Sequence, residues 1–347
     1  MKWYRTLSEK GTLKDKIMSL SLIIKKDTLS SLPYVRQLLK MANKKDRKQA
    51  FLAVDALQEI FTKHLLPEDR KLRTFRKVID EAEEKKIKQT DTMLCETYHE
   101  HLLRAIYIEY VDLLGKCTND NLDYFKKLSI SIISDCLMER PEREETLLSL
   151  LINKLGDPNN EIPKHTTTNI VRVLKKHNNM TQVVTGEIQQ YIQNVKTPAI
   201  YFYISLLNKI VFFEDDIDYI TYVLKLYFSQ FKRLNTERNE NHKNEILTLI
   251  LRGINSIATN LDPTTLESTF NSVADEVTHL FRLTNSNSFK VKIEALKLIF
   301  LFIKVDESLT DRFYKTLYKI VGSLKNVSAL KLDSTFALLY KAIKRDR

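Results

Sequence analysis

The sequence predicts an all-α fold, an α-solenoid of HEAT- or armadillo-like helical repeats. Apolar residues recur at intervals of three and four along most of the 347 residues, and short polar breaks separate the apolar segments. The chain contains only 6 Gly and 7 Pro, too few for the many tight turns of a β-rich fold. Because the sequence shows no clean repeat period, the repeat class stays open, and a multi-lobed helical domain is the alternative.

The stretch from Asn43 to Phe75 organises the N-terminal part of the chain. Its apolar residues predict one buried helical face, formed by Phe51, Val54, Leu57 and Phe61. Basic residues precede this helix, where the helix dipole disfavours cations, so we expect them to serve an anion. Leu65-Leu66-Pro67 then breaks the helix, and a second basic cluster follows. We expect this break to fold the second cluster back toward the first, so that both line one groove.

Two shorter helices precede this stretch. The first begins at Thr12, and Asp15 completes a variant of the capping box. The second begins at Leu32 and tolerates Pro33 in its first turn. Short helices with short connections indicate stacked pairs.

Further helices are expected along the rest of the chain. Their ranges are 94–114, 122–137, 147–155, 167–176, 182–195, 199–211, 219–231, 246–257, 266–281, 289–303, 311–324 and 330–343. Ile162-Pro163-Lys164-His165 is expected to delay the start of the fourth of these helices.

Polar breaks separate the helices. Residues 76–90 form a solvated helix or a linker, residues 214–218 an acidic turn, and residues 233–243 an exposed loop. The breaks define three expected regions: a basic N-terminal helical region (1–90), central helical repeats (91–232) and a C-terminal helical region (233–347).

Composition bounds the class of protein. Hydrophobic residues make up 43% of the chain, enough to form a core. No apolar signal segment follows Met1, and the longest apolar run, Leu298 to Ile303, is too short to span a bilayer. Three widely spaced cysteines predict reduced thiols in an intracellular protein. We therefore expect neither secretion nor a membrane partner.

Charge is concentrated at the N-terminal end. The net charge is +11, and residues 1–90 contain 22 basic and 12 acidic residues, an excess of 10. The remainder contains 33 basic and 32 acidic residues and is almost neutral. A basic end on a neutral body favours a polyanion-binding surface over a uniformly solvated one.

Seven basic residues are expected to form an RNA phosphate-binding surface. They are Lys44, Lys45, Arg47, Lys48, Arg70, Lys71 and Arg73. Such contacts are electrostatic and give affinity with little sequence readout. The alternative is that Glu68 and Asp69 neutralise Arg70 and Lys71 locally, which leaves a solvated turn.

The sequence predicts no catalytic, metal or cofactor site. His99-Glu100-His101 superficially resembles a zinc-binding helix, but its histidines are two residues apart instead of four. Cys95 and His99 are four apart, and no second ligand pair accompanies them. Gly-rich phosphate loops, nucleophile elbows and kinase motifs do not occur. We therefore expect a non-enzymatic protein without a small-molecule substrate.

A series of short motifs spans almost the whole chain. They are AVDAL (53–57), LLP (65–67), DRKLR (69–73), LLSLLINKLGDP (147–158), MTQVVTGEIQQY (180–191), HLFRLTNSNSF (279–289), DRFYKTLY (311–318) and LLYKAIKRD (338–346). In kind and order they resemble the CCAAT-binding-factor family of nucleolar complex proteins. The chain departs from the family at YIQNVK (191–196), where an arginine is missing, and its end at Arg347 suggests a short form.

The resemblance implies a non-catalytic helical-repeat scaffold for assembly of the large (60S) ribosomal subunit in the nucleolus. The implied partners are pre-ribosomal RNA, a second nucleolar complex protein in a heterodimer and other pre-60S assembly factors, without a cofactor. Some apolar residues between Leu266 and Tyr340 are expected to stay exposed for the protein partner.

Two other functions are weighed against this one. A HEAT-type transport or protein-interaction adaptor without RNA binding is the alternative. A CCAAT-box transcription factor is the third interpretation, and no groove-reading motif supports it.

Overall fold

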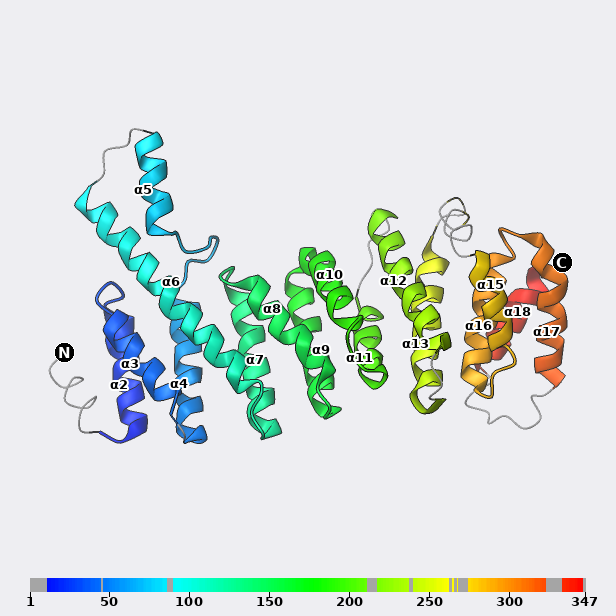
Figure 1. Ribbon diagram of the computed structural model, residues 1–347, viewed down its shortest axis with the longest axis horizontal. Helices are drawn as coiled ribbons and strands as arrows, with labels where there is room; N and C mark the ends of the chain where they lie inside the picture. The colour runs from blue at the N-terminus through cyan, green and yellow to red at the C-terminus, as the bar shows by residue number, and fades with distance from the viewer. Residues whose placement is uncertain are drawn as a thin grey trace. The chain divides into compact units, whose positions relative to one another are not determined.

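A computed structural model shows the chain as a series of helices (Figure 1). The structure describes residues 11–44, 46–85, 90–210, 217–236, 240–261, 264, 267, 274–322 and 333–345. Within these ranges every regular element is helical, and none is a strand. The predicted all-α class is therefore confirmed. None of the helices in these ranges is long and apolar enough to cross a membrane.

Two compact units make up the chain, Met1–Asn178 and Asn179–Arg347. Their boundary falls inside the central region, 91–232, that was drawn from polar breaks in the sequence. The compact units are defined by contacts between helices, whereas the three regions were defined by charge and by polar breaks in the sequence. The division into three regions therefore stays a prediction.

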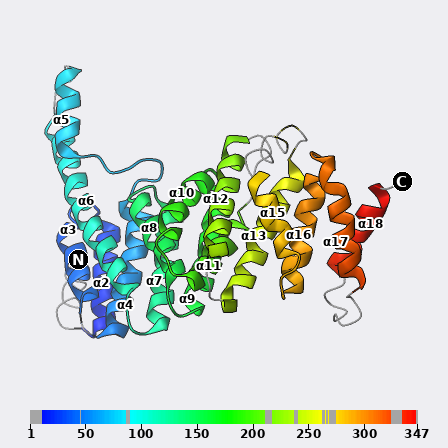
Figure 2. The same cartoon turned by 45° about the vertical axis from the view of Figure 1, so that its right-hand side comes forward.

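The first unit is built from helices that pack on their neighbours in the sequence. They are α2 (Leu13–Lys26), α3 (Leu32–Ala42), α4 (Arg47–Ile60), α5 (Phe75–Glu84), α6 (Asp91–Cys117), α7 (Asp123–Glu139), α8 (Glu144–Asn153) and α9 (Glu161–Lys176). α2, α3 and α4 pack on one another, as do α7, α8 and α9, while α6 contacts members of both groups. α5 packs on α6, and Figure 2 shows this pair projecting beyond the other helices of the unit.

The second unit follows the same rule. Its helices are α10 (Thr181–Ile192), α11 (Thr197–Leu207), α12 (Ile217–Thr236), α13 (Glu240–Asn260), α15 (Ala274–Leu283), α16 (Phe289–Phe302), α17 (Thr310–Gly322) and α18 (Asp333–Arg345). α13 packs on α11, α12 and α16, and α16 packs in turn on α15, α17 and α18. Stacking of near neighbours in sequence defines an α-solenoid, so the predicted architecture is confirmed within each unit.

The organising stretch forms α4, and its apolar face is buried as predicted. Val54, Leu57 and Phe61 are fully buried, and Phe51 is 6% exposed. The Tyr110 hydroxyl donates a hydrogen bond of 3.1 Å to the carbonyl oxygen of Val54, which ties α4 to α6. This face therefore holds the core of the first unit together.

The predicted break after this helix takes an unusual form. α4 continues into a π-helix, Phe61–Leu65, and the backbone becomes extended at Leu66. The Arg140 guanidinium donates a hydrogen bond to the carbonyl oxygen of Thr62 inside this widened turn. A wider turn leaves carbonyl groups in need of new donors, and Arg140 supplies one.

Two expectations about helix boundaries are wrong. α9 begins at Glu161, earlier than expected, because Pro163 lies in the first turn, where a backbone N–H has no partner within the helix. The expected loop at 233–243 is largely helical, since α12 continues to Thr236 and α13 begins at Glu240.

Other expected segments are described only in part. α5 confirms a helix in the charged segment 76–90, of which residues 86–89 lie outside the described residues. Residues 214–216 of the expected acidic turn lie outside them too. The helices expected at 266–281 and 330–343 are described from Ala274 and Asp333 onward.

Gly253 provides a test of packing in the second unit. A Cβ atom at this position would lie 2.5 Å from the Asn208 side-chain oxygen and 2.6 Å from the Tyr227 ring, whose hydroxyl donates to that oxygen. We expect Gly253→Ala to lower the free energy of unfolding by about 1–3 kcal/mol in a urea titration. A Cβ at Gly186 in α10 would meet nothing within 4 Å, so Gly186→Ala should raise stability by about 0.5–1 kcal/mol. Equal effects of the two substitutions would contradict this packing.

Candidate nucleic-acid interface

The first basic cluster lies at the start of α4. Lys44 and Lys48 are exposed, and Lys45 lies outside the described residues. α4 begins at Arg47, and the Asp46 side chain caps it by accepting the backbone N–H of Gln49 at 3.4 Å. An acidic cap offsets part of the cost of placing cations at a helix N-terminus.

The cations of this cluster differ in their partners. The Arg47 guanidinium forms an ion pair of 2.9 Å with Asp120 and keeps 45% of its side chain exposed. In the described part of the chain, neither Lys44 nor Lys48 forms an ion pair. The two lysines are therefore available to an anionic ligand. We call Lys44, Arg47 and Lys48 the α4 basic surface.

The second basic cluster is tied to acidic residues distant in the sequence. Arg70 and Arg73 both pair with Glu100, at 2.7 Å and 3.0 Å. Lys71 pairs with Glu144 at 3.2 Å. The alternative weighed from the sequence was local neutralisation by Glu68 and Asp69, but Glu68 pairs with Arg140 at 3.1 Å.

These pairs anchor the extended segment between the π-helix and α5, residues 66–74, which we call the strap. Leu72 is 5% exposed, and its backbone N–H donates to the Glu142 carboxylate at 2.7 Å. Glu142 is itself 3% exposed and lies 3.9 Å from the Arg104 guanidinium. The DRKLR motif therefore has a structural role in addition to any role in binding.

The two basic clusters do not line one groove. Arg47 contacts Asp120, just beyond the C-terminal end of α6, whereas Arg70 and Arg73 contact Glu100 in its first half. Along α6 these points are about 25 Å apart, at about 1.5 Å per residue. The expectation that Pro67 folds the second cluster back onto the first is wrong, because Glu100 holds the strap in the first half of α6, away from Asp120.

The strap makes a pH-dependent contribution to stability. Burial works to raise the pKa of the Glu100 carboxyl, but hydrogen bonds from Arg70 and Arg73 outweigh it and lower the pKa from 4.5 to about 2. Because the pKa is lower in the folded state, the ionised carboxylate stabilises the folded state at any pH above the unfolded-state pKa. This stabilisation is lost as the pH falls from 4.5 toward 2. We expect about 2 kcal/mol of unfolding free energy to disappear over this range, after allowance for the half-exposed arginines.

Acid titration of wild type and Glu100→Gln measures this contribution. The variant should lack the part of the pH dependence that Glu100 supplies. Glu145→Gln, a change at an exposed carboxylate, should keep the wild-type profile. Identical profiles of wild type and Glu100→Gln would show that the strap does not depend on this carboxylate.

Two of the residues weighed for a zinc site, His99 and Glu100, have other partners. The His99 imidazole Nε2 lies 3.1 Å from the carbonyl oxygen of Thr28, and Glu100 binds the two strap arginines. Cys95 is exposed as a free thiol. Among the described residues, no group of three or more His, Cys, Asp or Glu side chains is placed to hold a metal ion.

Sequence reasoning missed a further group of basic residues in the second unit. Lys341 and Lys344 of α18 lie with Lys297 of α16 around one cavity. The motif LLYKAIKRD was noted only for its family resemblance. Its two lysines are three residues apart, a spacing that places both on one helical face and could have indicated a basic surface. Lys297 gives no such signal, because tertiary packing alone brings α16 beside α18.

Comparison with known proteins gives several relatives that align with nearly the whole chain. Three of them are CCAAT/enhancer-binding protein zeta of Mus musculus at 29% identity over 351 residues, Ribosome biogenesis protein NOC1 of Chaetomium thermophilum at 28% over 397 residues, and Nucleolar complex protein 1 of Drosophila melanogaster at 26% over 361 residues. Each alignment covers 99% of this chain, and 33%, 37% and 30% of the respective relative. The chain therefore spans about a third of the length of these relatives.

Two further comparisons add little. No protein-family model matches the chain. A designed armadillo repeat protein matches 78% of this chain and 99% of its own length, with a TM-score of 0.35 and 13% identity. The repeat architecture accordingly rests on helix packing within each unit.

The fold defines a helical-repeat protein of the α-solenoid class. The relatives named above share 26–29% identity with it over almost its full length. This similarity confirms the resemblance of the motifs to the CCAAT-binding-factor family of nucleolar complex proteins.

Proposed function

We propose that the protein is a non-catalytic ribosome biogenesis factor, a scaffold for assembly of the 60S subunit in the nucleolus. The observation that carries this proposal is the alignment of the chain, over 99% of its length, with relatives named for ribosome biogenesis and for a nucleolar complex. An α-solenoid suits a scaffold, because its stacked helices offer long surfaces to several partners.

Pre-ribosomal RNA is the proposed nucleic-acid ligand. The α4 basic surface supports this part of the proposal, since Lys44 and Lys48 are exposed and have no described ion pair. Lys45 belongs to the same cluster on sequence grounds. Contacts of lysine with phosphate give affinity without sequence readout, which suits a scaffold.

Arg70, Lys71 and Arg73 have a smaller share in this proposal. Each keeps roughly half of its side chain exposed, but Glu100 and Glu144 already neutralise part of their charge. Changing all three to Glu would also place like charges against Glu100 and release the strap. That triple variant is expected to lose stability together with RNA affinity, so it does not isolate binding.

A cleaner test changes Lys44 and Lys48 to Glu and leaves the strap intact. We expect the affinity of the full chain for a single-stranded pre-rRNA fragment to fall about tenfold, and the slope of log affinity against log salt to fall by about 1.4, or about 0.7 for each lost phosphate contact. Lys315→Glu with Lys319→Glu, on exposed positions of α17, makes the same charge change as a control. An unchanged salt slope in the Lys44 and Lys48 variant would contradict an RNA contact there.

Protein docking is proposed for an apolar face of the last helix. Phe336, Tyr340 and Ile343 of α18 are 57%, 68% and 59% exposed, and their spacing places them on one helical face. We call this set the α18 apolar stripe. Leu338 and Ala342 cover the opposite, buried face at 2% and 1% exposure. The expectation that apolar residues of this region stay exposed is confirmed.

The proposed occupant of the stripe is a second nucleolar complex protein. The Drosophila melanogaster relative is named as a component of such a complex. Exposed aromatic side chains are typical anchors of protein interfaces, since they bury much area at low entropic cost. Other pre-60S assembly factors are proposed as further partners of the scaffold.

A further inference from the structure

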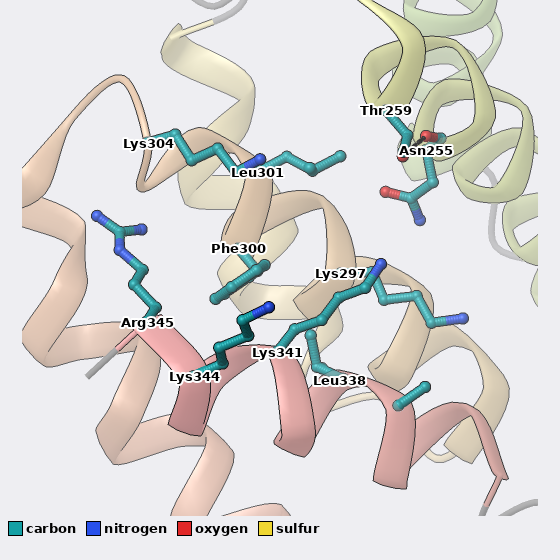
Figure 3. Close-up of a pocket in the computed structure, with 11 residues that line it drawn as sticks. Asn255, Thr259, Lys297, Phe300, Leu301, Lys304, Leu338, Lys341, Lys344 and Arg345 are labelled. Atoms are coloured by element: carbon teal, nitrogen blue, oxygen red, sulfur yellow. Dashed lines mark hydrogen bonds between the residues drawn. The ribbon is translucent and has the colours of Figure 1, made fainter. Parts of the chain in front are cut away.

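The second unit contains a cavity of about 410 Å³ that is partly open to solvent and is lined by α13, α16 and α18 (Figure 3). α16 supplies Lys297, Phe300 and Leu301, and α18 supplies Leu338 and Lys341. Figure 3 shows these side chains around one hollow, with Asn255 and Thr259 of α13 on its far wall. The volume is in the range of small-molecule sites.

Basic side chains dominate the polar lining of the cavity. They are Lys297, Lys304, Lys341, Lys344 and Arg345. Glu294 engages Lys297 at 3.2 Å and Arg252 at 3.4 Å, so its charge is already balanced. Over the described ranges, Lys304, Lys341 and Lys344 form no ion pair. Several unneutralised cations around one hollow favour a ligand with a multiply charged anionic group.

The positions of these cations argue against a purely local role. Lys304, Lys344 and Arg345 lie at the C-terminal ends of α16 and α18, where cations balance the helix dipole. Lys297 and Lys341 lie a turn or more inside their helices, so this local role does not account for them. Arg345 donates a hydrogen bond of 3.1 Å to the carbonyl oxygen of Ile303, which joins the two helix ends at the rim.

Asn255 contributes an unpaired acceptor. Its side chain is 9% exposed, and its amide Nδ2 donates to the backbone oxygen of Glu294 at 3.0 Å and to the carboxylate at 3.2 Å. These two acceptors fix the orientation of the Asn255 amide. Its oxygen, Oδ1, is buried and accepts no hydrogen bond from the described residues. A buried acceptor left unpaired is unfavourable, so a ligand N–H or O–H at this wall would be stabilised.

We propose that this cavity binds a nucleotide, presented either by single-stranded RNA or as a free nucleotide. Lys341 and Lys344 meet the phosphate, the base lies against the apolar wall of Phe300, Leu301 and Leu338, and a base N–H donates to Asn255. A phosphate matches the cations, and a flat ring with N–H donors matches both the apolar wall and the unpaired acceptor. The RNA form rests on the proposed role in pre-rRNA binding, whereas the free-nucleotide form stands without it.

The test changes Lys341 and Lys344 to Glu in the full chain. Both side chains are exposed, and circular dichroism should show unchanged helical content. With a short fluorescent single-stranded RNA of mixed sequence, we expect about tenfold weaker binding and a salt slope lower by about 1.4. AMP, measured by calorimetry, should bind wild type and lose this binding in the variant. Lys315→Glu with Lys319→Glu, the same charge change on α17, should leave both ligands within about twofold of wild type.

The outcomes separate this site from the α4 basic surface. If the Lys44 and Lys48 variant loses RNA affinity while the Lys341 and Lys344 variant binds RNA and AMP as wild type does, the cavity proposal fails and the proposed function stands. AMP binding without any RNA binding supports the free nucleotide and removes the RNA-binding part of the proposed function. If the α17 control loses as much affinity for RNA and AMP as the Lys341 and Lys344 variant does, the cavity proposal fails. The cavity proposal also fails if the wild-type protein binds a polyglutamate peptide but binds neither RNA nor AMP.

Discussion

Replacing Phe61 by alanine is expected to lower the free energy of unfolding of the first compact unit by about 3–5 kcal/mol. Phe61 is fully buried, and its ring centroid lies 5.0 Å from that of Tyr107 and 5.1 Å from that of Tyr110. Truncation removes a whole ring from the core that α4 shares with α6. The cavity left behind cannot close, because packed helices on all sides hold it open.

Urea unfolding followed by circular dichroism measures this loss. The chain has two compact units, so the relevant transition is the one assigned to the first unit. Leu52→Ala is the matched control, because Leu52 lies on α4, which runs directly into the π-helix at Phe61, and is 48% exposed. It should change stability by no more than about 0.5 kcal/mol. Similar losses for the two substitutions would contradict the buried face of α4.

Changing Phe336 and Tyr340 to serine is expected to abolish co-purification of the nucleolar complex partner. Both side chains are more than half exposed in this chain, so their loss should leave the fold intact. Central aromatic anchors each contribute about 2 kcal/mol or more to an interface, so losing both should cost about 4 kcal/mol and weaken binding about a thousandfold.

Pull-down of the tagged full chain, with quantitation of the partner, measures this effect. Tyr124→Ser serves as the control, since Tyr124 is an equally exposed aromatic, at 71%, in the first unit. The control should retain the partner at the wild-type level. Full retention by the Phe336 and Tyr340 variant would exclude the α18 apolar stripe as the docking face.

Helix positions were largely predictable from the sequence, because helical burial leaves a local pattern. The spacing of Phe51, Val54, Leu57 and Phe61 was enough to identify the buried face of α4. Errors arose where local signals mislead. Pro163 suggested a late start for α9, although a first-turn proline costs a helix little, and the polar segment 233–243 suggested a loop, although solvated helix ends are equally polar.

The candidate site was less predictable, because its partners are distant in the sequence. The basic residues were identified from composition, but the acids that neutralise them were sought among adjacent residues. Arg70 instead meets Glu100 on α6, and Leu72 meets Glu142 beyond the end of α7. Such pairs follow from how helices stack, which no local pattern encodes. For the same reason, the sequence did not indicate that Lys297 lies near Lys341, because only the packing of α16 against α18 brings them together.

The pH dependence at Glu100 and the salt dependence at Lys44 and Lys48 address different parts of the account. The first concerns the strap as a structural element, and the second concerns the RNA surface. Loss of RNA binding in the Lys44 and Lys48 variant with an intact strap would assign binding to the α4 basic surface alone. The DRKLR motif would then be a structural motif.

We propose that this solenoid binds pre-ribosomal RNA as an assembly scaffold. Crosslinking of RNA to the full-length protein in living cells tests it most directly, when the bound RNA is sequenced and the crosslinked peptides are identified. We expect pre-rRNA as the dominant RNA and crosslinked peptides that include residues 44–48. Recovery of protein cargo without pre-rRNA would contradict it and identify the chain as a protein-interaction adaptor.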